Sequence, residues 1–350
     1  MFDDLVVFDL STVLAGPSVA TFFAELGAKV TKIEHPKHRD VTRTWRIPGE
    51  TQEITSYFAS INYQKDYLLK DLSKAEDYTW LMNELKRVDV LIMNFKPSDY
   101  KKFNLSKESL LNINPRLIIG TISGFGDDTD RIAYDLILQA ETGFMAMNAE
   151  PNQMPLKMPV ALIDVLAAHQ LKEGLLLALL NLKKNGKGSW VSVSLYDAAV
   201  ASLVNQASAY LMNNLIPKRM GSLHPNIAPY GEIFTTKDGK LLTFAIGSNR
   251  QFIALCEVLK CDELAKNSRY LTNEGRVLHR STLSNELSHF VALLEAEALE
   301  ALCHNLLIPI GIIKSLDEVF CTEKARELIR EELQGTTNTK RVSQLAFKWK

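Results

Sequence analysis

The chain has 350 residues, and 40 lysines and arginines nearly balance 41 aspartates and glutamates, which gives a formal net charge of −1. This balance excludes a general electrostatic attraction to nucleic acid or to an anionic membrane. No run reaches the roughly 18 continuous apolar residues of a membrane span. The four cysteines form no CxxC pair, which argues against disulfides or a structural zinc site and predicts a cytoplasmic protein.

The first half of the chain alternates short apolar runs with helical patterns. Strands that alternate with helices predict βαβ units, and hence an α/β fold with a parallel sheet. A chain of this length usually divides into two domains, and we assign residues 1–216 to the first, larger one. Strands are expected at 5–10, 29–33, 67–69, 88–93 and 117–122, and helices at 17–26 and 74–86.

The second half begins with the most apolar region, 158–182, which we interpret as a buried strand followed by an amphipathic helix. A proline-rich linker follows at 217–225. A β-hairpin turning at Asp238-Gly239 and several helices then predict a smaller α+β domain at 226–320. The tail, 321–350, combines a charged helix with a final apolar alternation.

Asp164 is the most informative single residue, because it interrupts the apolar run VALIDVLAA. An ionised carboxylate is costly in such surroundings unless it has a specific role. Two interpretations remain open from the residues alone. The carboxylate either caps the N-terminus of a helix, or it acts as a base or nucleophile in a site poor in water.

Polar segments follow several of the predicted strands. LAGPS (14–18) opens a helix after the first strand, NFKPSDYKKF (94–103) follows a later one, and a basic run spans 35–46. Ligands of open α/β sheets bind at the carboxyl ends of strands, so these segments are candidates for an anionic ligand, although solvated surface is the commoner role of basic runs. The acidic GFGDDTD (124–130) is interpreted as a surface turn. No histidine or cysteine pattern predicts a metal site.

Taken together, the segments resemble the family III CoA-transferases, also called the CaiB/BaiF type. The similarity extends over residues 5–347, and the 219–259 segment is similar to members that use dicarboxylic acids. The blocks that carry it are LAGPSVATFFAELGAKVTKIEHP, NFKPSDYKKFNLS, NPRLIIGTISGFG, AYDLILQAETGFM and VALIDVLAAHQLKEGLLLAL.

The resemblance implies a CoA-transferase that moves CoA between an acyl-CoA thioester and a free carboxylic acid, with a dicarboxylic acid as the expected substrate. Asp164 would form an aspartyl anhydride and then an aspartyl-CoA thioester, with no cofactor and no metal. The large domain would be a Rossmann-like CoA-binding domain that the tail, 321–350, completes, and two chains would interlock as a ring-like homodimer. The implied CoA contacts are Leu14, Ala15, His35, Lys70, Asn94, Phe95, Lys102, Tyr134 and Asp135.

Two alternatives accompany this prediction. The racemase branch of the family, which acts on α-methylacyl-CoA, has a histidine before an aspartate where this chain has Tyr134 and Asp135. One of the two α-proton bases is therefore missing, and we rank the racemase below the transferase. The other alternative is a catalytically silent paralogue that binds CoA, because the family's LGEHT-like motif does not follow Phe347.

Overall fold

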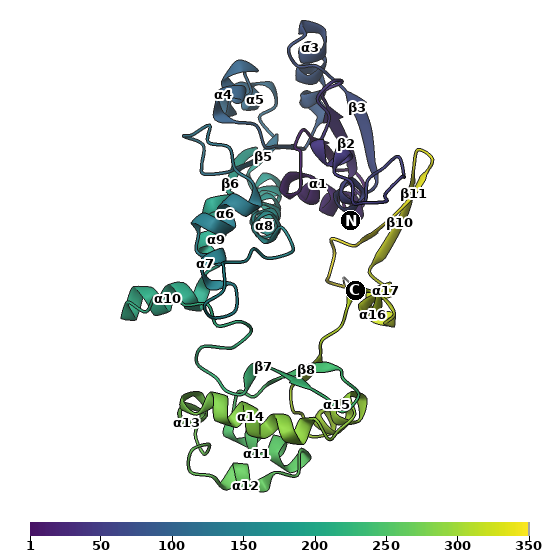
Figure 1. Ribbon diagram of the computed structural model, residues 1–350. Helices are drawn as coiled ribbons and strands as arrows, with labels where there is room; N and C mark the ends of the chain where they lie inside the picture. Colours follow the sequence, from purple (N-terminus) through teal and green to yellow (C-terminus); the bar gives the residue numbers. More distant parts are fainter. Residues whose placement is uncertain (349–350) are drawn as a thin grey trace. The chain divides into compact units, whose positions relative to one another are not determined.

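The computed structural model describes residues 1–348 and divides into two compact units (Figure 1). The first unit contains 1–145, 157–217 and the segment from 324 onward, and the second contains 146–156 and 218–323. The prediction assigned 146–156 to the large domain, whereas the structure groups this segment with the second unit. Residues 349–350 of the predicted tail lie outside the described range.

The first unit is built on a sheet of six strands, all of them parallel to their neighbours. The predicted α/β fold with a parallel sheet is confirmed. The order β3-β2-β1-β4-β5-β6 runs outward from β1 on one side and starts again with β4 on the other, so the topology reverses between β1 and β4. The strands are β1 (Val6–Asp9), β2 (Lys29–Glu34), β3 (Lys65–Leu69), β4 (Val90–Met93), β5 (Ile118–Ser123) and β6 (Ser189–Ser194).

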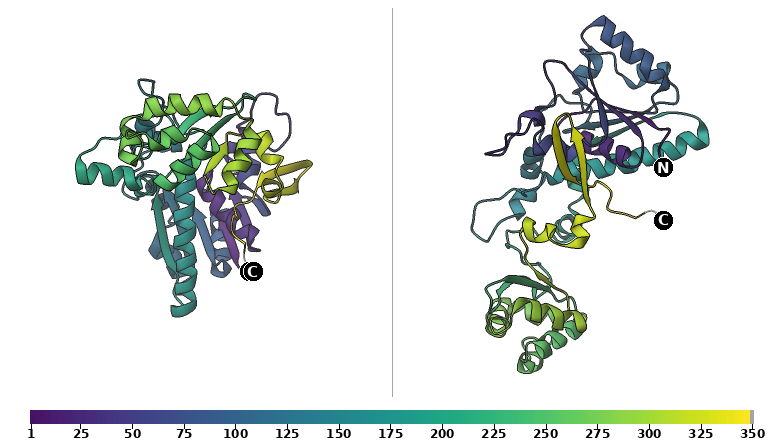
Figure 2. Two further views of the ribbon diagram at one scale, coloured as in Figure 1. Left: turned by 90° about the horizontal axis from the view of Figure 1, so that it is seen from below. Right: turned by 90° about the vertical axis from the view of Figure 1, so that its right-hand side faces the viewer.

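Helices cover both faces of this sheet, because successive strand residues point to opposite sides. In β4, Val90 and Ile92 pack into one core with α1 (Ala15–Glu25) and α8 (Leu162–Asn185). Leu91 and Met93 pack into another with α3 (Ala75–Glu84), α5 (Lys107–Ile113) and the short turn η2 (Leu85–Arg87). Figures 1 and 2 show α1 and α8 side by side against the sheet.

The predicted strand at the start of the 158–182 region does not form. The segment 158–161 is irregular, and one helix, α8, continues from Leu162 to Asn185. Its buried residues Ile163, Ala167, Leu171 and Leu175 recur every fourth position, which is the spacing of one helical face. The sequence prediction was wrong here because a short apolar run has no period of its own that separates a strand from a buried helix.

The predicted charged helix of the tail is largely replaced by an antiparallel hairpin, β10 (Ile329–Gln334) and β11 (Thr337–Val342). Only the short helices α16 (Leu316–Phe320) and α17 (Glu323–Arg326) precede it. The hairpin lies beside α2 (Ser56–Ile61), and the side chain of Gln334 donates to the carbonyl of Asn62. Figure 2 shows the two paired strands of the hairpin in yellow. Gly335 turns the chain with a φ of 59°. Its strands carry mostly charged and polar side chains, which conceals their alternation in the sequence.

Six shorter helices connect these parts of the chain. They are η1 (Val41–Thr44), α4 (Pro97–Lys102), α6 (Asp135–Glu141), α7 (Phe144–Met147), α9 (Leu195–Ala201) and α10 (Val204–Asn213). Within residues 1–348, none of the helices combines the length and the apolar character that crossing a membrane requires.

The second unit pairs an antiparallel sheet with helices. The predicted hairpin is present as β7 (Tyr230–Thr235) and β8 (Leu241–Ala245), and β9 (Ile310–Ile312) adds a third strand beside β8. Gly239 has a φ of 77°, which suits glycine at this turn. The helices are α11 (Asn249–Val258), α12 (Asp262–Lys266), α13 (Asn273–Leu278), α14 (Arg280–Val291) and α15 (Ala296–Asn305).

Candidate active site

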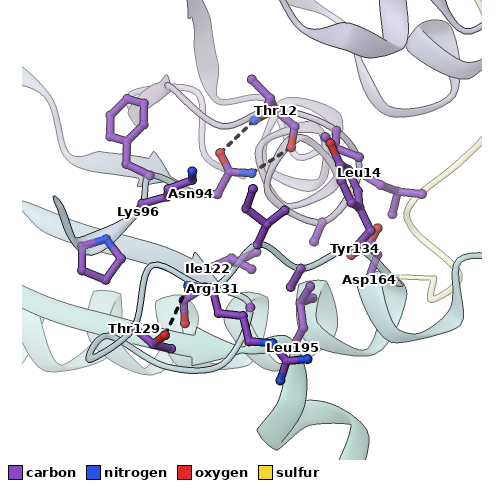
Figure 3. Close-up of a pocket in the computed structure, with 18 residues that line it drawn as sticks. Thr12, Leu14, Asn94, Lys96, Ile122, Thr129, Arg131, Tyr134, Asp164 and Leu195 are labelled. Atoms are coloured by element: carbon purple, nitrogen blue, oxygen red, sulfur yellow. Dashed lines mark hydrogen bonds between the residues drawn. The ribbon is translucent and has the colours of Figure 1, made fainter. Parts of the chain in front are cut away.

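A cavity of about 270 Å³ lies where β1, β4 and β5 end (Figure 3). This is the carboxyl edge of the sheet beside the topological reversal between β1 and β4, the usual ligand position in open parallel sheets. The lining residues come from 12–15, 94–97, 122–124, 129, 131–134, 164 and 195. All of them belong to the first unit. The fold therefore brings together around Asp164 side chains from Thr12 to Leu195, which are 183 positions apart in the chain.

Asn94 joins the loop after β4 to the loop after β1. Its amide nitrogen donates to the carbonyl of Thr12 at 2.9 Å, and its amide oxygen accepts from the N–H of Thr12 at 3.1 Å. Figure 3 shows both bonds. The amide of Asn94 thus shapes the wall of the cavity, while the predicted contacts Leu14, Ala15 and Phe95 line it directly.

Four buried charged side chains surround the loop that follows β1, residues 10–14. Asp9 pairs with Lys65 at 2.9 Å, and Asp40 pairs with Lys32 at 3.2 Å. Lys32 also donates to the carbonyl of Ser11 at 2.7 Å. Burial opposes the ionisation of Asp9, but the two lysines and the Ser11 hydroxyl hold its pKa below the usual value. Two cations and two anions are therefore matched inside the protein, as buried charges require.

This charge network holds a strained backbone at the edge of the cavity. Val13 has a φ of 72°, a left-handed conformation that a β-branched side chain rarely adopts. The carboxylate of Asp40 accepts the N–H of Val13 at 3.3 Å. On the other side of the loop, a Cβ on Gly16 would overlap the side chain of Ser11, so this position requires glycine. The strain persists because the surrounding contacts over-determine the loop.

Asp164 occupies the third position of α8, after the first helical residue Leu162. The residue is 8% exposed and lines the cavity. Ala161 is the N-cap, and within residues 1–348 no hydrogen-bond donor contacts the Asp164 carboxylate, so the N-cap interpretation is wrong. Burial, and secondarily the nearby carboxylate of Asp135, raises the pKa of Asp164 to about 7.

Asp135 fixes the start of α8 from the neighbouring helix α6. One of its carboxylate oxygens accepts the N–H of Ile163 at 2.7 Å, and the other accepts from the side-chain amide of Gln139 at 2.6 Å. Tyr134, one residue earlier, lines the cavity, and its side chain lies beside Leu14 and Asp164 in Figure 3. The Tyr134-Asp135 pair therefore both borders the cavity and positions Asp164.

The sequence did not identify Tyr57 as part of these surroundings. Burial, followed by the charges of Asp164, Asp135 and Asp40, raises the pKa of Tyr57 to about 12. The phenol consequently keeps its proton at neutral pH and can act as a donor. No motif marks this tyrosine, and only the fold places it within the electrostatic field of the two carboxylates.

Four of the predicted CoA contacts do not line the cavity, namely Asp135, which contacts α8 instead, and the basic residues His35, Lys70 and Lys102. His35 and Lys70 follow the adjacent strands β2 and β3, where His35 contacts Asp71 at 3.4 Å and Lys70 pairs with Asp77 at 2.8 Å. Lys102 ends α4, and its ammonium lies 4.9 Å from the centre of the Phe103 ring. These basic side chains remain at the carboxyl edge of the sheet, but outside the residues that surround Asp164.

The acidic segment 124–130 forms the predicted surface turn at its exposed residues 127–128. Gly124 and Thr129 of the same segment, together with the following residues 131–134, form one wall of the cavity. Arg131 lines it, donates to Glu141 at 2.9 Å and lies 4.0 Å from the centre of the Phe125 ring. Lys96, from the strand-end segment 94–103, lines the wall formed after β4. Among residues 1–348 no group of three or more histidine, cysteine or acidic side chains is arranged to hold a metal ion.

Comparison with known proteins adds independent information. The family model CoA-transferase family III matches residues 2–350. The succinate–glutarate CoA-transferase of Agrobacterium fabrum is 34% identical over 343 residues, which cover 95% of this chain and 85% of that protein. Human succinyl-CoA:glutarate CoA-transferase is 34% identical over 286 residues, covering 81% and 64%. The crystal structure of a CaiB/BaiF family protein from Brucella suis superimposes with a TM-score of 0.84 at 33% identity, covering 99% and 92%.

Proposed function

Because the chain belongs to CoA-transferase family III, we propose that it transfers CoA from an acyl-CoA thioester to a free dicarboxylic acid. The observation that carries the proposal is the state of Asp164, a buried carboxylate that lines the cavity at the reversal of the sheet and that no hydrogen-bond donor among residues 1–348 contacts. Relatives that act on succinate and glutarate support the dicarboxylic class.

The reaction divides into two exchanges at Asp164. Its carboxylate attacks the acyl-CoA carbonyl, so that an aspartyl mixed anhydride forms and CoA leaves as the thiolate. The thiolate then attacks the aspartyl carbonyl, which releases the donor acid and leaves CoA on Asp164 as a thioester. The acceptor carboxylate and the released thiolate reverse these two steps and restore Asp164. Each bond broken is matched by one formed, so the thioester energy is conserved without ATP or a metal.

Two features of the described residues support this chemistry. Asp164 lies in the first turn of α8, and Leu14 and Ala15 begin α1 at the wall of the same cavity. Helix N-termini favour negative charge, including the oxyanions of both exchanges. The apolar residues beside Asp164 limit water, which would otherwise hydrolyse the anhydride.

We assign the CoA moiety to the same cavity, with Lys96 and Arg131 as the cations nearest to it and His35, Lys70 and Lys102 further along the sheet edge. Charge-assisted contacts of this kind suit the phosphate groups of CoA. The interlocked homodimer expected from the family resemblance stays a prediction, and light scattering at micromolar protein concentration tests it.

A transfer assay tests the proposed function directly. The protein is incubated with succinyl-CoA and glutarate, and with a panel of other acyl-CoAs and acids, and mass spectrometry identifies the CoA products. We expect glutaryl-CoA and succinate, and hydroxylamine added with the acyl-CoA should convert Asp164 to its hydroxamate. Asp164→Asn is the matched control and should give neither product. No exchange with any acid, or an adduct on another residue, contradicts the proposal.

A further inference from the structure

A second cavity of about 270 Å³ lies along α8, next to the candidate active site. Val165 lines it, and this residue directly follows Asp164 in the chain. Leu14 lines both cavities, so the two cavities adjoin at this residue. From Val165 the second cavity continues past Ala168 to Lys172. It therefore extends from the proposed nucleophile toward a lysine two helical turns away.

Lys172 is a buried cation that has no anionic partner in the part of the chain that the structure describes. The residue is 5% exposed, and its ammonium donates to the amide oxygen of Gln344 at 3.1 Å. The ammonium also lies 5.3 Å from the centre of the Phe22 ring. None of the ion pairs within residues 1–348 includes Lys172, in contrast to the matched lysines beneath the loop after β1. A neutral amide and an aromatic face stabilise a buried charge far less than a carboxylate does.

Such a cation next to an empty volume favours an anionic ligand. Burial lowers the pKa of Lys172 to about 8, so the ammonium is still mostly protonated at neutral pH. An anion placed beside it would recover electrostatic energy that desolvation has removed. Ser18, which lines the same cavity and is 3% exposed, adds a hydroxyl donor. The apolar walls formed by Leu14, Val165 and Ala168 suit the methylene groups of a short chain.

We propose that this second cavity binds the non-reacting carboxylate of the dicarboxylic acid, with Lys172 as its main contact. The proposal rests on the proposed function, because the other carboxyl group of the same acid must react at Asp164. The eight-residue separation corresponds to about 12 Å between the two Cα atoms, and helical side chains tilt toward the N-terminus. In a helix this tilt carries the long side chain of a lysine toward the N-terminal end, where α8 carries Asp164, and we therefore assign the subsite to a diacid with a short methylene chain. Lys172 is accordingly a specificity-determining residue.

The test compares glutarate with pentanoate, a monocarboxylic acid of the same carbon number, as acceptors for one acyl-CoA donor. Lys172→Met keeps the length of the side chain and removes its charge. Lys184→Met removes an exposed charge from the last turn of the same helix and is the control. We expect Lys172→Met to lower the kcat/KM ratio of glutarate to pentanoate by about 10- to 100-fold, mainly through the KM for glutarate. Lys184→Met should leave this ratio unchanged.

A binding experiment separates failure of this proposal from failure of the proposed function. Glutarate is titrated calorimetrically into the wild-type protein and both variants, with acetate as a second ligand. Glutarate binding that Lys172→Met abolishes and Lys184→Met retains supports the subsite, even if no acyl-CoA is turned over. Equal glutarate binding in all three proteins overturns it. Acetate binding that depends on Lys172, with an unchanged glutarate-to-pentanoate ratio, also overturns it, because the cavity would then hold an independent small anion.

Discussion

The molecule buries charge in two contrasting ways at the two sides of its cavity. Beneath the loop after β1, Asp9 and Asp40 are paired with Lys65 and Lys32, so that four charges cancel. At the start of α8, Asp164 is also buried, but within residues 1–348 neither a cation nor a hydrogen-bond donor contacts its carboxylate, and its pKa rises to about 7. Burial is the largest single influence on the pKa of both Asp9 and Asp164, and it raises both values. The lysines and Ser11 outweigh burial at Asp9, so the pKa of Asp9 falls while that of Asp164 rises.

The comparison shows that the paired carboxylate of Asp9 stabilises the fold, whereas the unpaired carboxylate of Asp164 is available for a reaction. A paired carboxylate is a poor nucleophile because its lone pairs are already engaged, and it is costly to disrupt. An unpaired one destabilises the protein but is available to a substrate. The network thus defines the loop geometry, while Asp164 retains the reactivity. Substitution of Asp164 should therefore mainly lower activity, and substitution within the paired network should mainly lower stability.

The largest effect is expected for Asp164→Asn, which keeps the shape of the side chain and removes its charge. Transferase activity should fall about 10⁴-fold or more, because the nucleophile is lost. The folded protein binds the Asp164 proton more tightly than the unfolded chain does, so ionisation destabilises the fold as the pH rises from about 4 to 7. The variant should accordingly gain up to about 4 kcal/mol of stability at pH 8 and progressively less toward pH 5.

Activity assays and thermal unfolding at pH 5.5 and pH 8 measure both sides of this prediction. The corresponding variant of a surface carboxylate, Asp66→Asn, serves as the control for a change of net charge. A variant that keeps transferase activity, or that is less stable than the wild type at pH 8, would contradict the functional role assigned to Asp164.

The second largest effect is a loss of stability, expected when a lysine of the buried charge network beneath the loop after β1 is replaced. Lys65→Met leaves Asp9 with only the more distant Lys32, at 3.8 Å, and should lower the free energy of unfolding by about 3–5 kcal/mol. The control is Lys340→Met, which breaks an ion pair of similar length, 2.7 Å to Glu331, in an exposed hairpin. That change should cost less than about 1 kcal/mol. Denaturant unfolding gives both values, and equal losses would show that burial does not distinguish the pairs.

The smallest effect concerns the pH dependence of kcat/KM, which the ionisation of the unpaired Asp164 should determine. In the wild type, kcat/KM should rise about tenfold per pH unit below pH 7 and level off above it, because only ionised Asp164 attacks the thioester. Asp135→Asn removes the second cause of the raised pKa but keeps an oxygen for the N–H of Ile163. Its profile should move to lower pH, with a midpoint that remains above 3.8 because burial is the larger cause.

Initial rates between pH 5 and 9 in buffers of constant ionic strength test this shift. Gln139→Ala, which removes the other side-chain partner of Asp135 but no charge, is the control. A midpoint that stays in place or moves to higher pH in Asp135→Asn would mean that Asp135 does not act electrostatically on Asp164.

The parallel sheet and the importance of Asp164 could be predicted from the sequence, because both depend on local patterns. Alternating strands and helices identify βαβ units, and a lone acidic residue in an apolar run is conspicuous. The first turns of α8 were misassigned as a strand because apolar residues alone do not distinguish two buried elements. The hairpin of β10 and β11 was missed because its strands are charged.

The cavity wall was less predictable, because contacts between distant segments have no local signal. Arg131 follows an acidic stretch that is typical of a surface turn, and Tyr57 belongs to no motif. Asn94 was predicted to contact CoA, but its amide is bonded to the backbone of Thr12, a residue 82 positions away. Lys172 likewise contacts Phe22 of α1 and Gln344 of the tail rather than a carboxylate, and these contacts between distant segments cannot be predicted from the sequence.

The segmented build of the first unit has a consequence for its biosynthesis. Arg341, in the last segment of that unit, pairs with the buried Glu25, and Gln344 accepts from Lys172. Roughly 300 residues separate Glu25 from its cation, so translation at about 5–20 residues per second delays this pairing by about 15–60 s. The second unit, whose last residue is 323, can be completed earlier. The first unit thus begins to leave the ribosome before the second but is completed after it. Its nascent form must remain soluble until Arg341 has been synthesised and pairs with Glu25.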